Sequence, residues 1–557
     1  MSQSIRVGVC RVKSAVALVV ILMVLHGCGS SNSSNPFPIN EDTVSVCTTS
    51  SSANTIISGT VTFDRVFHLA NNALDYNNII AEPVRGALVE IVCNQDGIAI
   101  ASGSTDDKGD YSLSISSDSG SVFVRVKAQM KKTGTPRWDF SVVDNTQNKA
   151  LYVLDGSVFD PGADASIRNL HAPSGWGESL YSSVRAAGPF AILDSVYEAF
   201  NKVLLSKPAA VFPALKLNWS KNNIPSPGEL ELGEINTSFF NGVEIYLLGA
   251  ENVDTDEYDG HVIIHEFAHY LEANFSRSDS IGGSHSALSR LDIRVAFSEG
   301  FGNAFSGIAT DDPYYRDSEG NAQSTGFGFN VDNNNCTIKG WYNECSVQAI
   351  IYDLYDSTPE STDTVKLGFT PLFDVLSNEH KNTDAMTSIF SFIYELKQKN
   401  LSKASDIDIL VAEQKIDVIT DVYGDSETNN NPGTTDMLPV HGVIMLNDSS
   451  PVNVCSTDEF QVFNGLGVNR FLRFTLPTTQ AVTITANKTS GAGNDPDIYL
   501  YCRGQIVSVA ETSNPDREIL NSPILFPYYT YVIEVYDFGN LDVGVGPTCF
   551  NVTVTTP

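Results

Sequence analysis

The residues best suited to chemistry in this chain form the segment His265-Glu266-Phe267-Ala268-His269. The segment lies within an apolar run from Val262 to Leu271, which predicts a buried helix. On a helix, residues four apart share one face, so both imidazoles can reach one metal ion. Glu266 can then deprotonate a metal-bound water. Zinc is the usual metal for two imidazoles and a carboxylate, and an open fourth position makes such a site catalytic.

Chance is the alternative explanation for this spacing. Histidine is scarce, with 9 among 557 residues, so composition alone rarely produces two histidines four apart around a glutamate. The motif also needs a helical context, and the apolar residues on both sides supply it. A metal site is therefore the favoured interpretation.

The third ligand does not come from the same helix. His261 lies one turn earlier, but His261 and His269 are about 12 Å apart along a helix axis, and metal–nitrogen bonds of about 2 Å cannot span that distance. We expect His261 at the start of the helix or beside the ligands. The metzincin pattern requires a glycine and a third histidine where this chain has Glu272 and Phe275, so that pattern fails.

Glu299 is the better candidate for the third ligand. It lies within the apolar segment 295–305, which predicts a second helix. A lone carboxylate among Phe and Ala side chains is costly unless something pairs with it, and a metal ion would do so. Asp292 and Asn303 fall on the same helical face as Glu299, which predicts that both support the ligands. The alternative for Glu299 is an ordinary acid on the helix surface.

At these two helices the chain resembles the gluzincin metallopeptidases, the clan of thermolysin and aminopeptidase N. Members of that clan pair HExxH with a glutamate on a following helix, and Ser298-Glu299-Gly300-Phe301 is similar to the string around the third ligand of aminopeptidase N relatives. The gap from His269 to Glu299 is longer here, and its segment 276–285 is predicted to be an inserted loop at the site's rim. The resemblance supports the clan rather than a particular enzyme.

The resemblance implies zinc-dependent hydrolysis in which Glu266 takes a proton from water and delivers it to the leaving amine. It also implies a tyrosine or histidine that donates a hydrogen bond to the developing oxyanion. His285, in the Gly-Gly loop, and Tyr342, in the segment 340–344, are both candidates. The alternative for each is a plain loop or core residue.

Two segments before the motif have predicted supporting roles. Residues 239–249 form a strand pattern, and in the resembled clan the edge strand of a sheet binds peptide by adding a strand. We expect this segment to be that edge or its neighbour. The acidic stretch 254–260 then leads into the helix, and its favoured role is N-capping and interaction with the helix dipole. A calcium-binding loop is the alternative.

The N-terminus predicts export and lipidation. Basic residues precede an apolar run from Ala15 to Leu25, which is too short to span a bilayer but suits a signal peptide at residues 1–27. Leu25-His26-Gly27-Cys28 is similar to a bacterial lipobox, with Cys28 as the lipidated residue. Gly29, in place of Asp, then favours the outer membrane, and residues 28–54 form a flexible tether. The alternative is an ordinary cleaved signal with a coincidental cysteine.

Charge and cysteine content agree with an exported chain. The 34 basic and 66 acidic residues give a net charge of −32, which argues against nucleic-acid binding and suits calcium. Exported chains keep disulfides. Cys336 and Cys345 are close enough for a local bridge, and Cys47 can pair with Cys93. Three further cysteines share the last domain, so one is left over: Cys455, Cys502 and Cys549.

The chain is predicted to be multidomain, with a β-sandwich at each end. Residues 55–155 alternate short strands and turns, and resemble the transthyretin-like domain of carboxypeptidase regulatory regions at Ala87-Leu88-Val89-Glu90-Ile91 and Asp107-Lys108-Gly109-Asp110-Tyr111. Residues 450–557 are similar to the bacterial pre-peptidase C-terminal domain at Asp495-Pro496-Asp497-Ile498-Tyr499-Leu500. Between them, residues 160–448 are predicted to form an α+β zincin-like domain with a mostly helical C-terminal half.

The leading hypothesis is an outer-membrane-anchored zinc endopeptidase or aminopeptidase that acts on a peptide or protein substrate. The alternative is a cell-surface binding protein with a degenerate peptidase domain. The sequence argues against degeneracy because all four residues of the predicted site are present: His265, Glu266, His269 and Glu299. Metal-dependent hydrolysis of a non-peptide bond is a third hypothesis, since HExxH determines water activation and not the substrate.

Overall fold

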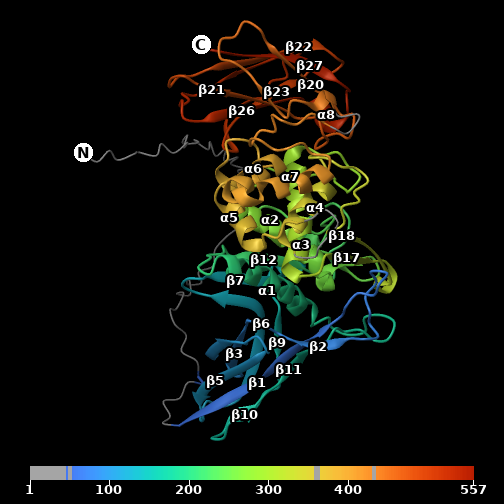
Figure 1. Ribbon diagram of the computed structural model, residues 1–557. Coiled ribbons are helices and arrows are strands. Elements are labelled where there is room, and N and C mark those ends of the chain that lie inside the picture. Colours follow the sequence, from blue (N-terminus) through green and yellow to red (C-terminus); the bar gives the residue numbers. More distant parts are fainter. Residues whose placement is uncertain (1–45, 48–52, 357–363, 430–434) are drawn as a thin grey trace, which may run out of the picture.

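The computed structural model describes residues 46–47, 53–356, 364–429 and 435–557. The predicted signal peptide and Cys28 lie outside these described residues. No helix within them is both long and apolar enough to cross a membrane. Figure 1 shows the N-terminal strands, a helical middle region and the C-terminal strands stacked along one direction.

The N-terminal region is built from two sheets with a shared core. In one, β1 (Asn54–Arg65) pairs antiparallel with β2 (Ile80–Pro83) and β5 (Asp110–Ser116), and parallel with β10 (Ser166–Ile167) and β11 (Leu170–Ala172). The other contains β3 (Ala87–Cys93), β4 (Ala99–Ser104) and β6 (Val122–Lys132). Along β6, buried and partly exposed side chains alternate, as a strand with one face on a core requires.

The second sheet continues into the helical region. Its order is β13-β14-β12-β7-β6-β3-β4, with β8 (Ala150–Leu151) beside β7 and β9 (Val153–Asp155) beside β6. The strand β7 (Trp138–Asp144) pairs in parallel with β12 (Leu215–Trp219), and β14 (Ile245–Leu247) and β13 (Phe239–Phe240) follow. The predicted domain boundary at residues 155–160 therefore does not interrupt this sheet, and β13 ends its order.

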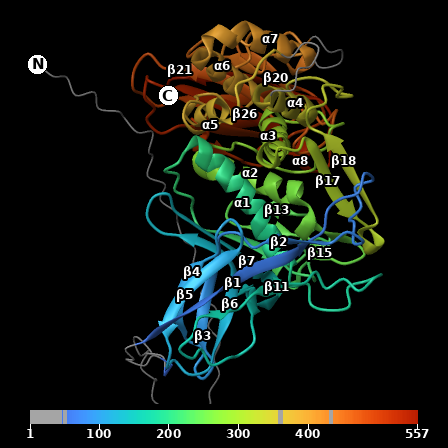
Figure 2. The same ribbon diagram turned by 60° about the horizontal axis from the view of Figure 1, so that its bottom comes forward.

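The helices pack against this sheet and against one another. Figure 2 shows α1 (Gly188–Ser206) between the N-terminal strands and the other helices. The helix α1 packs against α2 (Gly260–Phe275) and α3 (Ile293–Thr310), which are buried along most of their length. Polar side chains on helices buried in this way need partners, because an unpaired polar group is costly away from water. The remaining long helices are α4 (Glu344–Tyr355), α5 (Phe369–Ser377), α6 (Ile389–Lys399) and α7 (Ala404–Glu413).

A small four-stranded sheet lies beside α2. It consists of β15 (Gly249–Ala250), β16 (Asp254–Thr255), β17 (Tyr314–Glu319) and β18 (Thr325–Asn330), in that order. The pair β17–β18 is a hairpin that follows α3, whereas β15 and β16 precede α2. This sheet therefore joins the segment before α2 to the segment after α3.

The C-terminal region has two sheets that enclose an apolar core. One has the order β19-β21-β26-β23-β24 and the other β20-β27-β22-β25. The strands are β19 (His441–Val443), β20 (Val452–Ser456), β21 (Arg470–Thr475), β22 (Thr483–Ser490), β23 (Pro496–Cys502), β24 (Gln505–Ala510), β25 (Arg517–Asn521), β26 (Thr530–Asp537) and β27 (Thr548–Thr555), with the short α8 (Gly539–Asp542) before β27. Sandwich-like sheets thus stand at both ends of the chain.

Three disulfides connect the described residues. Cys336–Cys345 and Cys47–Cys93 have the pairing expected from the sequence. The third joins Cys455 to Cys549 on neighbouring strands, and Cys502 is buried in the C-terminal core. Disulfides are typical of an extracellular or periplasmic protein.

Candidate active site

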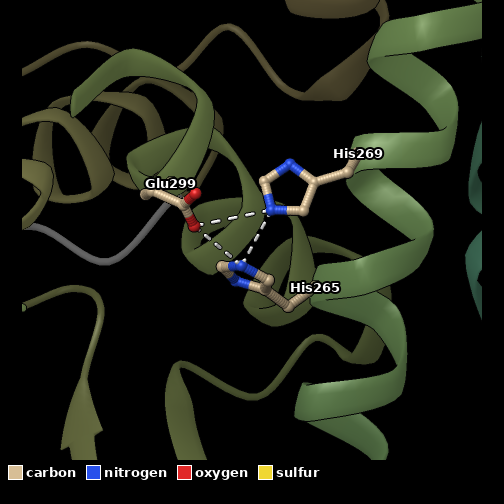
Figure 3. Close-up of side chains that lie close together, drawn as sticks. All are labelled: His265, His269 and Glu299. Atoms are coloured by element: carbon tan, nitrogen blue, oxygen red, sulfur yellow. Dashed lines mark hydrogen bonds and ion pairs between the residues drawn. The ribbon is translucent and has the colours of Figure 1, made fainter. Parts of the chain in front are cut away.

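Three side chains from two helices converge on one point. His265 and His269 come from α2, and Glu299 from the middle of α3; Figure 3 shows their rings and carboxylate pointing toward one another. The two Nε2 atoms are 3.1 Å apart, and Glu299 Oε2 is 3.2 Å from His265 Nε2 and 3.5 Å from His269 Nε2. The helix spacing in the sequence therefore places the three predicted ligand atoms together.

The ring of His265 is held in one orientation. Its Nδ1 lies 2.9 Å from Asn303 Oδ1, and Asn303 Nδ2 donates to Gln348 Oε1 at 2.9 Å. Because the amide oxygen of Asn303 accepts, Nδ1 of His265 carries the proton and Nε2 presents its lone pair to the cluster. Asn303, predicted to support the ligands, makes this contact one turn beyond Glu299.

The ring of His269 is held in the same way by a different pair. Its Nδ1 lies 3.3 Å from Glu272 Oε2 and 3.2 Å from Ser298 Oγ, and Ser298 donates to Glu272 at 2.5 Å. Glu272 is only 1% exposed. A carboxylate on the outer nitrogen of a histidine fixes its tautomer and increases its basicity as a metal ligand.

The donor set fits a zinc ion. Bonds of about 2.0–2.1 Å at tetrahedral angles separate neighbouring ligand atoms by about 3.3 Å, close to the three distances in the cluster. The two Nε2 lone pairs and the carboxylate oxygen face one another, and only positive charge relieves their repulsion. Although burial opposes charge, Glu299 and Glu272 raise the pKa of His269 well above its usual range. A proton on His269 supplies such positive charge, and a metal ion at the point where the three ligand atoms meet would take its place.

A glycine allows the two helices to approach at the site. A Cβ on Gly302 would lie 2.8 Å from ring atoms of His265. Glycine inside a helix costs about 0.5–1 kcal/mol relative to alanine, so its presence in α3 has a steric reason. Gly302 lets α3 bring Glu299 and Asn303 up to the imidazole of His265.

Glu266 points away from the helix axis toward the sheet edge. Its Oε2 accepts a hydrogen bond from the backbone N–H of Phe240, on β13, at 2.8 Å. Burial raises the pKa of Glu266, and the nearby His265 and His269 oppose this shift. A carboxylate with a raised pKa is suited to accept a proton near neutral pH.

His285 lies at the exposed side of the cluster. Its Nε2 is 3.3 Å from Glu299 Oε2, and its Nδ1 is 2.7 Å from Glu344 Oε2 at the start of α4. Burial opposes protonation, but the bond to Glu344 and the charge of Glu299 raise the pKa of His285 to about 9. The side chain is 34% exposed, so its ring faces solvent as well as the ligands.

Two other predicted residues lie elsewhere. The Tyr342 side chain is buried, and its hydroxyl donates to the carbonyl of Lys339 at 3.3 Å. Asp292 does not contact the ligands; it is the N-cap of α3, where its carboxylate accepts from Arg294 N at 3.0 Å and pairs with the Arg294 side chain. A separation of seven residues keeps the helical face but adds about 10 Å along the axis, which explains why the prediction for Asp292 was wrong.

His261 is the second residue of α2, at the start of the helix as expected, and its Nε2 bonds to the carbonyl of Asp312 at 3.0 Å, away from the cluster. The acidic residues before the helix differ from expectation. Asp259 occupies the N-cap position of α2 without a capping hydrogen bond. Its carboxylate instead accepts from the backbone N–H of Ser318 at 2.9 Å and lies 2.7 Å from His68 Nε2. The acidic stretch thus holds β17 rather than capping the helix.

The same stretch contributes to a second group of convergent carboxylates. Asp254, Asp256 and Asp317 each place an oxygen within 4.8 Å of the others. Burial and repulsion among neighbouring acids raise the pKa of all three. Among the described residues, Asp254 Oδ1 is a buried oxygen with no hydrogen-bond partner.

Sequence reasoning missed several supporting residues. Glu272 appeared only as a mismatch to the metzincin pattern, and Glu344 and Gln348 lie on α4, a helix with no sequence link to the motif. Tyr315 on β17 is also part of the site's wall, with its ring edge-to-face on His265 at 6.4 Å between centroids. In the sequence, Tyr315 stands in a short run of residues typical of a strand. Such a run does not identify which residues its side chain contacts.

Comparisons with known proteins give little further information. No protein-family model and no curated protein matches the chain. The pre-peptidase C-terminal domain of a Bacillus anthracis collagenase is a weak structural neighbour, with 14% identity and a TM-score of 0.15 over 20% of this chain and 93% of that one. PliG, a periplasmic lysozyme inhibitor from Aeromonas hydrophila, has 11% identity and a TM-score of 0.13 over 20% and 98%. Likenesses this weak carry no argument about function.

Proposed function

We propose that this chain is a zinc-dependent peptidase of the gluzincin type, with His265, His269 and Glu299 as the metal ligands. The observation that carries the proposal is the meeting of three ligand atoms at about tetrahedral separations, with the outer nitrogen of each imidazole already hydrogen-bonded. A zincin-like organisation of the central region belongs to this proposal. An arrangement prepared in this way needs no rearrangement to accept the ion.

The neighbouring groups suit the hydrolysis of a peptide bond. When bound, zinc would polarise the scissile carbonyl and make water acidic enough to be deprotonated near neutral pH. Glu266 would take that proton and pass it to the leaving amine, with its carboxylate steadied by Phe240 N–H. His285, oriented by Glu344, would donate a hydrogen bond to the carbonyl oxygen as negative charge develops there.

The sheet edge next to Glu266 suits an extended substrate. The strand β13 ends the order of its sheet and pairs with β14. An extended peptide can bind such an edge by adding a strand. Since Phe240 contacts Glu266, a peptide on β13 would run beside the general base, and this is the basis for proposing a peptide or protein substrate.

The cellular location of the protein and its binding of calcium remain predictions. The disulfides agree with an exported protein, whereas attachment to the outer membrane depends on lipidation of Cys28, outside the described residues. The calcium prediction now has a defined place to be tested, the carboxylates of Asp254, Asp256 and Asp317.

The test is hydrolysis of fluorescein-labelled casein by the wild-type chain and by Glu266→Gln. We expect wild-type activity that a zinc chelator removes and added zinc restores. The Glu266→Gln variant should keep its zinc and lose at least about 100-fold in rate, since the general base is absent. A zinc-loaded wild type that cleaves no peptide bond would contradict the proposal and favour the surface binding protein.

A further inference from the structure

A loop of the C-terminal sandwich contacts the segment that carries His285. Residues 457–469 connect β20 to β21, and we call them the clamp loop. They face residues 276–292, which connect α2 to α3 and carry His285; we call these the rim loop. The two loops pair through their backbones: Asp292 N donates to Asn464 O at 2.8 Å and Leu466 N donates to Arg290 O at 2.9 Å. The C-terminal region is thus joined to the loop that holds His285.

Asn464 is the centre of this contact. Its side chain is buried, and its Nδ2 donates to the carbonyls of Gly282 at 2.8 Å and Ser284 at 3.1 Å. Gln461 donates a further hydrogen bond to Ser284 O at 2.9 Å and one to Asn464 Oδ1. Ser284 directly precedes His285, so these bonds fix the backbone from which the imidazole extends.

The rim loop is shaped to accept the clamp loop. Gly283 has a φ of +99°, a conformation that side-chain-bearing residues rarely adopt. A Cβ at this position would also lie 2.8 Å from Asn464 Nδ2 and from the ring of Phe463. Glycine is required here for two independent reasons, and both belong to the contact with the clamp loop.

A buried ion pair holds the C-terminal sandwich against α3. Arg294, in the first turn of α3, pairs with Asp292 at 2.8 Å and with Glu534 of β26 at 2.7 Å. All three side chains are buried. Separating the C-terminal sandwich from α3 would leave these charges without partners, which is strongly unfavourable.

We propose that Asn464 is a positioning residue for the reaction, and that the C-terminal sandwich is thereby part of the catalytic unit. The inference rests on the proposed function, in which His285 donates to the oxyanion. Glu344 orients the imidazole through Nδ1, and the side chain is 34% exposed on its solvent side. The position of His285 therefore depends on its backbone, which Asn464 holds from the other domain.

The experiment replaces Asn464 by aspartate in the full chain. This change keeps the side-chain shape but removes the donor, and it sets a carboxylate against two carbonyl oxygens. The control is Asn453→Asp, an exposed asparagine on β20 whose amide donates to Asn551 Oδ1 at 2.9 Å within the C-terminal sheets. Zinc content, kcat and KM for one fluorogenic peptide, and hydrogen exchange of residues 276–292 are measured for both.

We expect Asn464→Asp to keep its zinc, with KM nearly unchanged and kcat lowered about 10- to 100-fold, since misplacing a reacting group by about 1 Å costs that much. Hydrogen exchange should increase in the rim loop and not in the control variant. Adding Asn464→Asp to His285→Gln should then cause little further loss, because residues that act as a unit are not additive. A purely structural defect would reduce activity in both backgrounds.

The two possible failures are distinguishable. Equal kcat and equal exchange in Asn464→Asp and Asn453→Asp, with an active wild type, would overturn the positioning role alone. A full further loss of kcat in the His285→Gln background would also overturn it. A wild type that binds zinc but cleaves nothing would contradict the proposed function, and the positioning role would fall with it.

Discussion

The two clusters of convergent ligand atoms among the described residues differ in how they balance charge. In the first, two imidazoles and one carboxylate meet, and the outer nitrogens of both rings are hydrogen-bonded to Asn303 and Glu272. In the second, Asp254, Asp256 and Asp317 bring only negative charge together. Nitrogen-rich tetrahedral sites suit zinc and oxygen-only sites suit calcium or a proton. The first cluster is thus organised for a particular ion, whereas the second is electrostatically unfavourable until a proton or a cation binds.

The largest effect should come from closing the space between α2 and α3. In Gly302→Ala the added methyl group would meet the ring of His265 at 2.8 Å, so the ring must move away from the other ligands. We expect loss of bound zinc, by mass spectrometry, with helix content by circular dichroism nearly unchanged. Gly260→Ala is the control, because its Cβ would meet only ordinary contacts, at 3.4 Å or more. Full zinc retention in Gly302→Ala would show that the helices need no such close approach.

An intermediate effect should separate the two supporting glutamates. Glu272→Gln weakens the contact that orients the ring of His269. Zinc affinity should therefore fall about 10- to 100-fold, as measured by competition with a chelating dye. Glu344→Gln changes the residue that orients His285, which is not one of the three ligands; it should lower kcat and leave zinc affinity nearly unaltered. Identical affinity losses in both variants would remove the distinction between ligand support and oxyanion support.

The smallest expected effect is on the folding stability that depends on the cluster of Asp254, Asp256 and Asp317. Because the folded-state pKa values of Asp254, Asp256 and Asp317 are raised, the folded chain binds more protons than the unfolded one. Stability is therefore fully present below the unfolded pKa of about 3.9 and falls as the pH rises through the raised values. Millimolar calcium should raise the melting temperature by about 2–4 °C at pH 8 and by less at pH 5.

Asp317→Asn provides the control for calcium binding. It removes one charge, so the melting temperature without calcium should rise and the calcium effect should disappear. The same calcium-dependent shift in the variant and in the wild type would exclude this cluster as the calcium site.

The sequence predicted the site helices well because their signals are local. The apolar runs around the motif and around Glu299 became α2 and α3, and the helical spacing brought the ligand atoms together. Asp292 was wrong because angular position on a helix does not include distance along its axis. Glu272 and Ser298 were missed as a pair because they come from different helices, and their contact depends on how those helices pack.

Contacts between segments far apart in the sequence could not be predicted for the same reason. The strand patterns within residues 55–155 do not identify parallel partners outside that range, so the continuous sheet from β7 through β12 was not foreseen. The C-terminal strands were predicted as a separate domain. Only the structure shows that Glu534 on β26 neutralises a buried arginine of α3.

Native mass spectrometry of the purified chain and of Glu299→Ala, after both are exposed to the same limiting zinc, tests the proposed metal centre. We expect one tightly bound zinc per wild-type chain, lost or much weakened in the variant, because Glu299 would supply the third ligand atom. Zinc retained equally by both chains would contradict the assignment of Glu299. Absence of zinc from the wild type after reconstitution would contradict the metal centre itself.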